Sequence, residues 1–261
     1  MTSTHRPARR GPRASVLAAA LAAGAAMAAP AAALDLSKMS ADESAAFGAA
    51  VRSYLLENPE VLVEVIGVLE QREAEARVAA DAAMLAENAE ALFENPTAWV
   101  GGNPEGDVTI VEFVDYRCSF CRQAHPEVEE LIASDGDIRF IVKEFPILGE
   151  QSVLASRFAL AARAVEGDDA YKAAHDALIT FRGDITPEAL GRLADALAFD
   201  AGAVMAEMES PEITDIIDAN RALAQRLAIT GTPTFVLGEE MVRGYLPLAE
   251  MQAVVAEQRA E

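Results

Sequence analysis

The sequence predicts an α/β fold with a helical insertion, preceded by an all-helical N-terminal arm. Two apolar runs, at 107–114 and 138–145, flank a helix-like segment at 123–132, and this strand–helix–strand order is typical of the start of a parallel sheet. Residues 152–227 then have a helical period almost throughout. Two further short apolar runs separated by a glycine, within 234–245, predict a β-hairpin that completes the sheet.

The first 33 residues have the composition of a secretory signal peptide. Four arginines precede an apolar run at 16–27, and the small residues at 31–33 close it. An uncleaved membrane anchor is the alternative, since 15–33 approaches spanning length. Alanine is weakly hydrophobic, so this alanine-rich run favours a cleaved signal peptide over a membrane anchor. We therefore expect export to the periplasm, an oxidising compartment.

Residues 34–100 predict a helical extension with one break. A first helix is expected near 42–56, and Asn58 and Pro59 suit the cap and first position of a second. The second helix begins with an apolar stripe at 62–69 and continues as an Ala/Glu/Arg-rich run. The stripe has no obvious partner within the chain, which favours an arm that joins copies of the chain into a homo-oligomer. A solvated linker helix in a monomer is the alternative.

A turn-rich boundary begins the second domain. An Asn-Pro step at 95–96 ends the helical arm, and glycines within 101–104 start a domain predicted at 101–261. The helical insertion is expected at about 150–228. A last amphipathic helix starts at Leu248.

Charge and cysteine content exclude several classes of protein. There are 42 acidic and 21 basic residues, a formal net charge of −21, so nucleic acid is not an expected partner. Only two cysteines are present, which excludes a disulfide-stapled scaffold and a four-thiolate metal site within one chain. His125 and His175 do not suggest a zinc site with these thiols, so we expect no metal and no cofactor beyond a redox-active disulfide.

The two cysteines form a Cys118-Ser119-Phe120-Cys121 motif between a predicted strand and a predicted helix. Free N–H groups and the helix dipole favour a negative charge there, so Cys118 should ionise below the usual thiol pKa of about 8.5. Cys121, one turn later, can form a disulfide with Cys118 or attack a mixed disulfide. We expect Cys118 to be the nucleophile and Cys121 the resolving thiol. A structural disulfide, half of an intersubunit zinc site, or two unreactive thiols are the alternatives.

Further motifs accompany the cysteines. Glu112 lies six residues before Cys118 and Pro126 five residues after Cys121, while Lys143 lies in the second predicted strand. A Gly231-Thr232-Pro233 loop precedes the hairpin. With these motifs, residues 107–261 resemble the thioredoxin superfamily, specifically its DsbA-like branch with a helical insertion. The segment 54–61 resembles the leading segment of ScsC-like and related DsbA-family proteins.

The resemblance implies a thioredoxin-like fold and a role for each motif. Glu112 would be a buried acid that relays protons for Cys121, with Lys143 as its basic partner. A plain buried ion pair or a solvent-facing carboxylate is the alternative. Pro233 would be cis and face the thiols, and Pro126 would bend the active-site helix. The implied substrate-binding positions are Ser119, Phe120, Gly231, Thr232 and Pro233.

The sequence therefore predicts a periplasmic thiol–disulfide oxidoreductase that acts on exported proteins and exchanges electrons with a membrane redox partner. Thr232 is shared by isomerase-type members of the wider family, and an oligomer can hold a misfolded client near several thiols, so isomerase is favoured over a DsbA-type dithiol oxidase. The dipeptide Ser119-Phe120 between the cysteines differs from the Gly-Pro of reducing thioredoxins and from the Pro-His of the most oxidising DsbA proteins, so it does not indicate a reduction potential. A client-binding chaperone or a Cu(I)-binding module is the alternative of another class.

Overall fold

A computed structural model describes residues 39–260, in two compact units that divide between Val65 and Ile66. The predicted signal peptide at 1–33 lies outside the described residues. Within 39–260, no helix combines the length and the apolar character needed to cross a membrane.

The first unit is helical, as predicted. It holds α1 (Ala41–Glu57) and the first turns of α2 (Glu60–Glu87). α1 begins with a capping box, in which the Glu43 amide donates to Ser40 Oγ and the Ser40 amide donates to Glu43 Oε2. It buries none of its residues. The exposed apolar side chains of this unit are Phe47, Val51, Tyr54, Leu56, Leu62, Val63 and Val65.

The second unit starts earlier in the chain than the predicted position 101. α2 ends at Glu87, and the short helix α3 (Ala89–Phe93) follows. Leu85 and Leu92 are buried in the core of this unit, so the end of α2 and all of α3 are part of its packing. Asn88 separates the two helices, and its side-chain oxygen accepts from Arg226 Nε at 2.6 Å.

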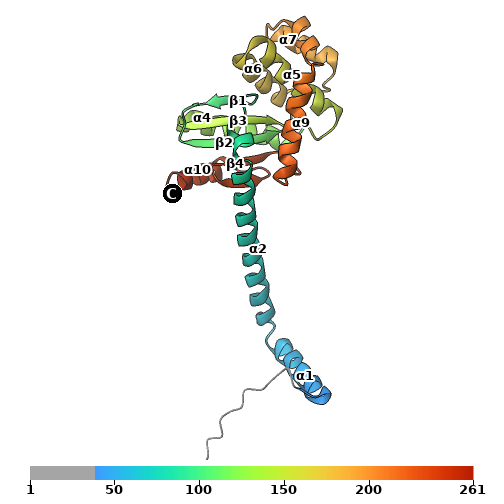
Figure 1. The fold of residues 1–261 in the computed structure, drawn as a ribbon, viewed down its shortest axis with the longest axis vertical. Coiled ribbons are helices and arrows are strands. Elements are labelled where there is room, and N and C mark those ends of the chain that lie inside the picture. The colour runs from blue at the N-terminus through green and yellow to red at the C-terminus, as the bar shows by residue number, and fades with distance from the viewer. Residues whose placement is uncertain (1–38, 261) are drawn as a thin grey trace, which may run out of the picture. The chain divides into compact units, whose positions relative to one another are not determined.

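A five-stranded mixed sheet forms the centre of the second unit, in the order β1-β3-β2-β4-β5 (Figure 1). β2 and β3 are parallel, as predicted, and the other pairs are antiparallel. The strands are β1 (Trp99–Gly102), β2 (Val108–Val114), β3 (Ile138–Glu144), β4 (Thr234–Leu237) and β5 (Glu240–Arg243).

The edge strand β1 was not predicted. Its two glycines indicated a turn, but Gly101 lies against the Trp99 ring, where a Cβ would overlap the indole. The absence of a side chain is therefore what lets Trp99 fold back over the strand. The indole stacks on Tyr171 at a centroid distance of 5.2 Å.

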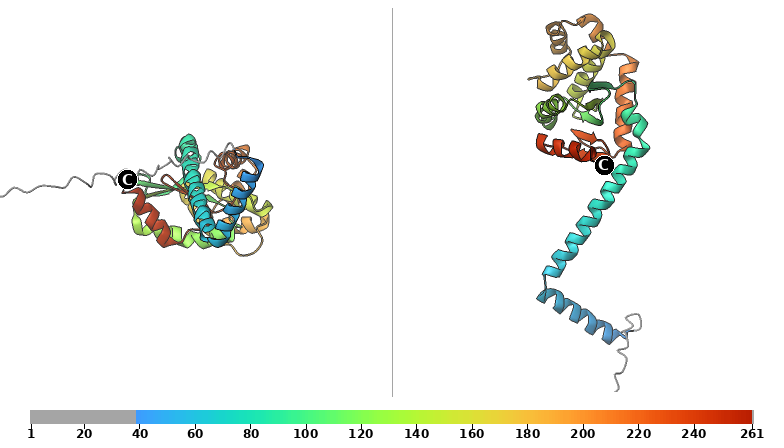
Figure 2. Two further views of the ribbon diagram at one scale, coloured as in Figure 1. Left: turned by 90° about the horizontal axis from the view of Figure 1, so that it is seen from below. Right: turned by 90° about the vertical axis from the view of Figure 1, so that its left-hand side faces the viewer.

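Helices cover both faces of the sheet. α4 (Ser119–Asp135) and α10 (Leu248–Gln258) pack together on one face, and α9 (Pro211–Arg226) lies on the other with α3 (Figure 2, right). Because both faces are covered, six of the seven residues in each of β2 and β3 are buried, including the charged Glu112, Lys143 and Glu144.

The predicted helical insertion lies between β3 and β4. Its first helices are grouped beyond the β1 edge of the sheet (Figure 1), and α6 contacts β1. The insertion therefore places new side chains beside the active-site helix α4, which α6 also contacts. Its members are α5 (Glu150–Glu166), α6 (Asp168–Thr180), α7 (Pro187–Ala196), α8 (Ala201–Glu207) and α9.

Candidate active site

The loop between β2 and α4 positions the first cysteine. Cys118 is the N-cap residue of α4, and its amide donates to the Asp115 carbonyl at 3.0 Å. The buried Asp115 carboxylate fixes this loop, because it accepts from the Arg117 amide at 2.8 Å and from the Ile147 and Leu148 amides at 2.8 and 3.0 Å. One carboxylate thus joins the cysteine loop to the loop after β3.

Cys118 is the acidic thiol of the pair. Its pKa is lowered to about 5, first by a hydrogen bond from Cys121, then by the Thr232 side chain and the amides of Cys121 and Phe120. Burial opposes this shift. The Cys118 Sγ also lies 3.1 Å from the Thr232 carbonyl, to which the protonated thiol donates. At neutral pH the thiolate therefore predominates, as the position at a helix N-terminus predicts.

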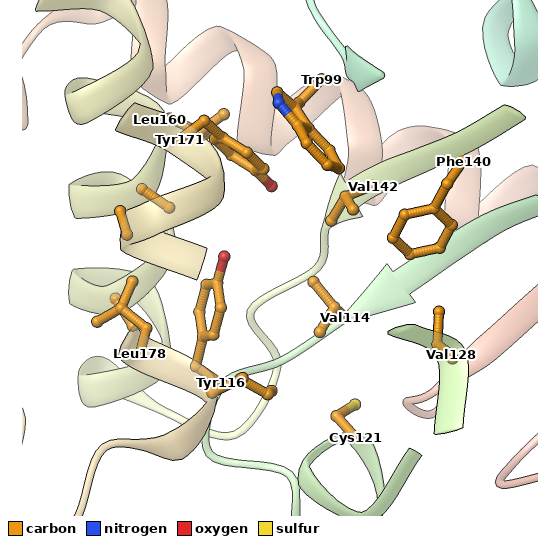
Figure 3. Packing of buried hydrophobic residues seen from close by; sticks show 14 of the residues in the cluster. Trp99, Val114, Tyr116, Cys121, Val128, Phe140, Val142, Leu160, Tyr171 and Leu178 are labelled. Atoms are coloured by element: carbon orange, nitrogen blue, oxygen red, sulfur yellow. The ribbon is translucent and has the colours of Figure 1, made fainter. Parts of the chain in front are cut away.

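Cys121 has the opposite character. Its side chain is fully buried in the cluster that contains Val114 and Val128 (Figure 3), and both cysteines are free. Burial raises the pKa of Cys121 first, followed by its hydrogen bond to Cys118 and the charge of Glu112. Cys121 therefore stays protonated until a base removes its proton.

Glu112 is a buried acid that is coupled electrostatically to both cysteines. It lies in β2 and is 3% exposed, and its pKa is raised to about 8 by burial, by the charge of Glu144 and by the Cys118 thiolate. A carboxyl group with this pKa exchanges protons near neutral pH.

Lys143 is not the partner of Glu112, which corrects the prediction. In the parallel pairing of β2 with β3, Glu112 lies opposite Val142 and Phe113 lies opposite Lys143. Successive strand residues point to opposite faces, so Glu112 and Lys143 are on different sides of the sheet. The Lys143 ammonium donates instead to the Ala91 carbonyl of α3 at 2.9 Å, and burial lowers its pKa to about 8.

The second acid on the Glu112 face is Glu144, which the sequence analysis missed. Its carboxylate accepts hydroxyl hydrogen bonds from Tyr116 at 2.7 Å and from Tyr171 and Ser156 at 2.6 Å. Figure 3 shows the two tyrosine hydroxyls pointing toward the same space. Burial still raises the pKa of Glu144 to about 7. A signal was present, because Lys143 and Glu144 are adjacent in an apolar strand and must face opposite sides.

The predicted substrate-binding positions lie around the sulfur of Cys118. Ser119 and Phe120 are exposed at the start of α4. The Thr232–Pro233 bond is cis, and the Thr232 carbonyl reaches Cys118. Gly231 is exposed beside it, and the Pro233 carbonyl accepts from the Gly244 amide at 2.9 Å.

Pro126 lies inside α4, as the resemblance implies. Proline has no N–H, so this position removes one hydrogen bond from the helix. The carbonyl left without that partner belongs to Arg122, in the turn that follows Cys121.

The acidic Cys118 can attack a disulfide, and the buried Cys121 can then resolve the mixed disulfide if a base such as Glu112 takes its proton. This chemistry, on a sheet with a cis-proline loop beside the thiols, defines the class of thioredoxin-fold thiol–disulfide oxidoreductases. The comparisons with known proteins agree with this class. Residues 109–256 match the DSBA-like thioredoxin domain family, to which the chain belongs. Residues 43–76 match the N-terminal domain of the copper resistance protein ScsC.

Individual relatives agree with the family. A solved thioredoxin-like oxidoreductase from Silicibacter pomeroyi is 41% identical, covering 66% of this chain and 98% of its own, with a TM-score of 0.62. BcfH from Salmonella enterica Typhimurium is 28% identical, covering 84% and 96%, with a TM-score of 0.70.

A curated relative is much longer than this chain. The Na(+)/H(+) antiporter NhaA 3 of Salinispora tropica is 28% identical over 60% of this chain, which spans about a quarter (24%) of the antiporter's length. The similarity therefore concerns one part of that protein.

Proposed function

We propose that this DsbA-like oxidoreductase rearranges disulfides in exported proteins, as a periplasmic disulfide isomerase. The observation that carries the proposal is the contrast between the two sulfurs. Cys118, with a pKa of about 5, is a thiolate ready to attack, whereas buried Cys121 holds its proton. An isomerase needs this contrast, because the mixed disulfide must persist while the client rearranges.

The isomerase cycle has no net redox change. The Cys118 thiolate attacks a client disulfide, forms a mixed disulfide and releases one client thiolate. That thiolate, or another on the same client, attacks a different client sulfur, and the last attack on the mixed disulfide returns the Cys118 thiolate. If Cys121 instead loses its proton, with Glu112 as the acceptor, it attacks Cys118 and releases a reduced client.

The surface around Cys118 supports binding of unfolded clients. Phe120, Ile147 and Leu148 are exposed apolar side chains, at 56%, 38% and 54%. Phe120 lies within the cysteine motif, and the amides of the other two are held by Asp115 near the same loop. The Thr232 backbone offers hydrogen bonds to an extended segment, a contact that tolerates many sequences.

The exposed helical arm supports an oligomer with several active sites. The exposures of Leu62, Ile66 and Leu69 are 49%, 53% and 52%, so one stripe of α2 remains uncovered within the described chain. Several sites in one assembly raise the effective concentration of attacking thiolates around a trapped client. A membrane redox partner would keep the dithiol reduced.

A dithiol oxidase is the second candidate, and the low pKa of Cys118 favours it. Stabilising the thiolate stabilises the reduced enzyme, which makes its disulfide a stronger oxidant. The oxidase would accept electrons from client thiols and pass them to the membrane partner.

Refolding of scrambled, multiply disulfide-bonded ribonuclease tests the proposal. The full chain should restore ribonuclease activity in a glutathione buffer, and Cys118→Ser should not. Deleting the whole arm is unsuitable, because Leu85 and Leu92 belong to the core of the second unit. We therefore use Leu62→Glu combined with Leu69→Glu, with Val78→Glu, another exposed α2 position, as the matched control.

The outcomes separate the candidates. If the protein is an oligomeric isomerase, the double variant should have the mass of a monomer in light scattering and should recover little ribonuclease activity. The control should keep the oligomer mass and the recovery of the parent. Negligible recovery with the parent protein, together with rapid oxidation of reduced ribonuclease, would reject the isomerase in favour of the oxidase.

A further inference from the structure

Two histidines and an aspartate from different helices converge beside the active-site helix. His125 belongs to α4, four residues after Cys121, while His175 and Asp176 belong to α6. One potential ligand atom from each of the three lies within 4.8 Å of the other two. The disulfide chemistry described above does not use any of them.

Hydrogen bonding fixes which nitrogen of His175 carries the proton. The Tyr116 hydroxyl donates its only proton to Glu144 Oε1 at 2.7 Å and lies 3.0 Å from His175 Nδ1. The hydroxyl oxygen must therefore accept from Nδ1–H. His175 is left with its lone pair on Nε2, which is the arrangement found in histidines that bind metal through Nε2 and are oriented by a hydrogen bond at Nδ1.

Asp176 has one oxygen free for a ligand. Lys172 Nζ lies 2.6 Å from Asp176 Oδ2 and 3.1 Å from Glu129 Oε2, so the lysine charge is already shared between two carboxylates. Asp176 Oδ1 is buried and lacks a hydrogen-bond partner. His125 Nε2 lies 3.5 Å from this oxygen.

We propose that His125, His175 and Asp176 form a site for a borderline divalent cation, for which zinc is the probe. Two imidazole nitrogens and one carboxylate oxygen, with water in the fourth position, are a ligand set that zinc accepts. Tetrahedral ligands about 2.0 Å from zinc are about 3.3 Å apart. The His125–Asp176 separation of 3.5 Å already meets this requirement, and the other separations, which are at most 4.8 Å, must shorten when the metal binds.

The site would join two parts of the second unit. α4 carries the cysteines at its start, and α6 belongs to the helical insertion. A cation held by His125 on one helix and by His175 and Asp176 on the other would crosslink them one turn beyond Cys121. The thiols are not ligands in this arrangement, so the proposal does not depend on the direction of disulfide exchange.

Zinc titration against a chromophoric chelator tests the proposal. The protein used for the titration is the full chain with both cysteines replaced, Cys118→Ser and Cys121→Ser, so that thiolates cannot bind the metal. We expect one zinc per chain, and at least about tenfold weaker binding in His125→Ala and in Asp176→Asn. Asp169→Asn, which removes an exposed carboxylate from the same helix, should bind zinc like the parent.

A second measurement tests whether the variants still fold. His125 and Asp176 are partly exposed, so their variants should keep the far-ultraviolet circular dichroism of the parent without metal. Zinc should raise the melting temperature of the parent and of Asp169→Asn, but not of the two ligand variants. Absence of zinc binding in the serine background, or equal affinity in all folded variants, would overturn the proposal.

Discussion

Replacing Glu112 with glutamine should stabilise the protein at high pH and leave its stability unchanged at low pH. Burial raises the pKa of Glu112 from 4.5 to about 8. At about 1.4 kcal/mol per pH unit, the charged carboxylate costs the folded state about 5 kcal/mol once the pH exceeds 8. Glutamine has nearly the same shape and carries no charge, so the variant avoids this cost.

The number of protons bound by the folded and the unfolded chain decides how the free energy of unfolding changes with pH. Below pH 4.5 the carboxyl is neutral in both the folded and the unfolded chain, so Glu112 carries no penalty there. Between pH 4.5 and 8 the unfolded chain releases the proton and the folded chain retains it, so the stability of the parent falls as the pH rises. The free energy of unfolding of Glu112→Gln should therefore exceed that of the parent by several kcal/mol at pH 9.

Urea denaturation of the disulfide-oxidised proteins at pH 4 and pH 9 measures this difference. Oxidation removes the Cys118 thiolate, the third cause of the raised pKa, so about 5 kcal/mol is an upper limit. Glu130→Gln, an exposed position of α4, is the control and should change little at either pH. An equal effect of Glu112→Gln at both pH values, or destabilisation at pH 9, would show that Glu112 is not held neutral by burial.

Three further perturbations test other parts of the structure. In the reduced protein, thiolate absorbance should rise with a midpoint near pH 5 from Cys118, and Cys121 should not titrate below pH 9 because burial raises its pKa. Leu92→Ala should lower the free energy of unfolding by about 2–5 kcal/mol, because Leu92 is fully buried. Asp81→Asn should cost about 1–2 kcal/mol, because Asp81 pairs with both terminal nitrogens of Arg243 at 2.7 and 2.8 Å in a partly buried site.

Each perturbation has a matched control. Cys118→Ser should abolish the absorbance change near pH 5, and its persistence would assign the change to another group. Leu56→Ala, at a position 67% exposed, and Asp218→Asn, in an exposed ion pair with Arg221, should each change stability by less than about 0.5 kcal/mol. A Leu92→Ala effect as small as that of Leu56→Ala would exclude α3 from the core.

Local patterns were sufficient to predict most elements of the fold. The segments 107–114 and 138–145 are rich in Val, Ile and Phe, which indicated buried strands, and the structure has β2 and β3 there. The break after α1 was visible at Asn58 and Pro59, where the Asn58 amide donates to the Tyr54 carbonyl. β1 was not predictable, since glycine disfavours strands and only the folded position of Trp99 explains Gly101.

The parts of the site that are built from residues close in sequence were predictable. The position of Cys118 at the start of α4 follows from the strand-to-helix order alone. The pairing of Glu112 with Lys143 failed because it depends on strand register, and a shift of one residue moves a side chain to the other face. His125 and Asp176 are 51 residues apart in sequence, and only the packing of α6 against α4 brings them together.

The hydrogen bond between Cys118 and Thr232 spans 114 residues of chain, with the whole insertion between them. During synthesis the cysteine leaves the ribosome well before the threonine. Until β4 docks beside β2, the sulfur lacks both the Thr232 carbonyl and the Thr232 side chain, which helps to lower the pKa of Cys118. A newly synthesised chain thus carries a less acidic thiol, which reaches its full acidity only when the chain has folded.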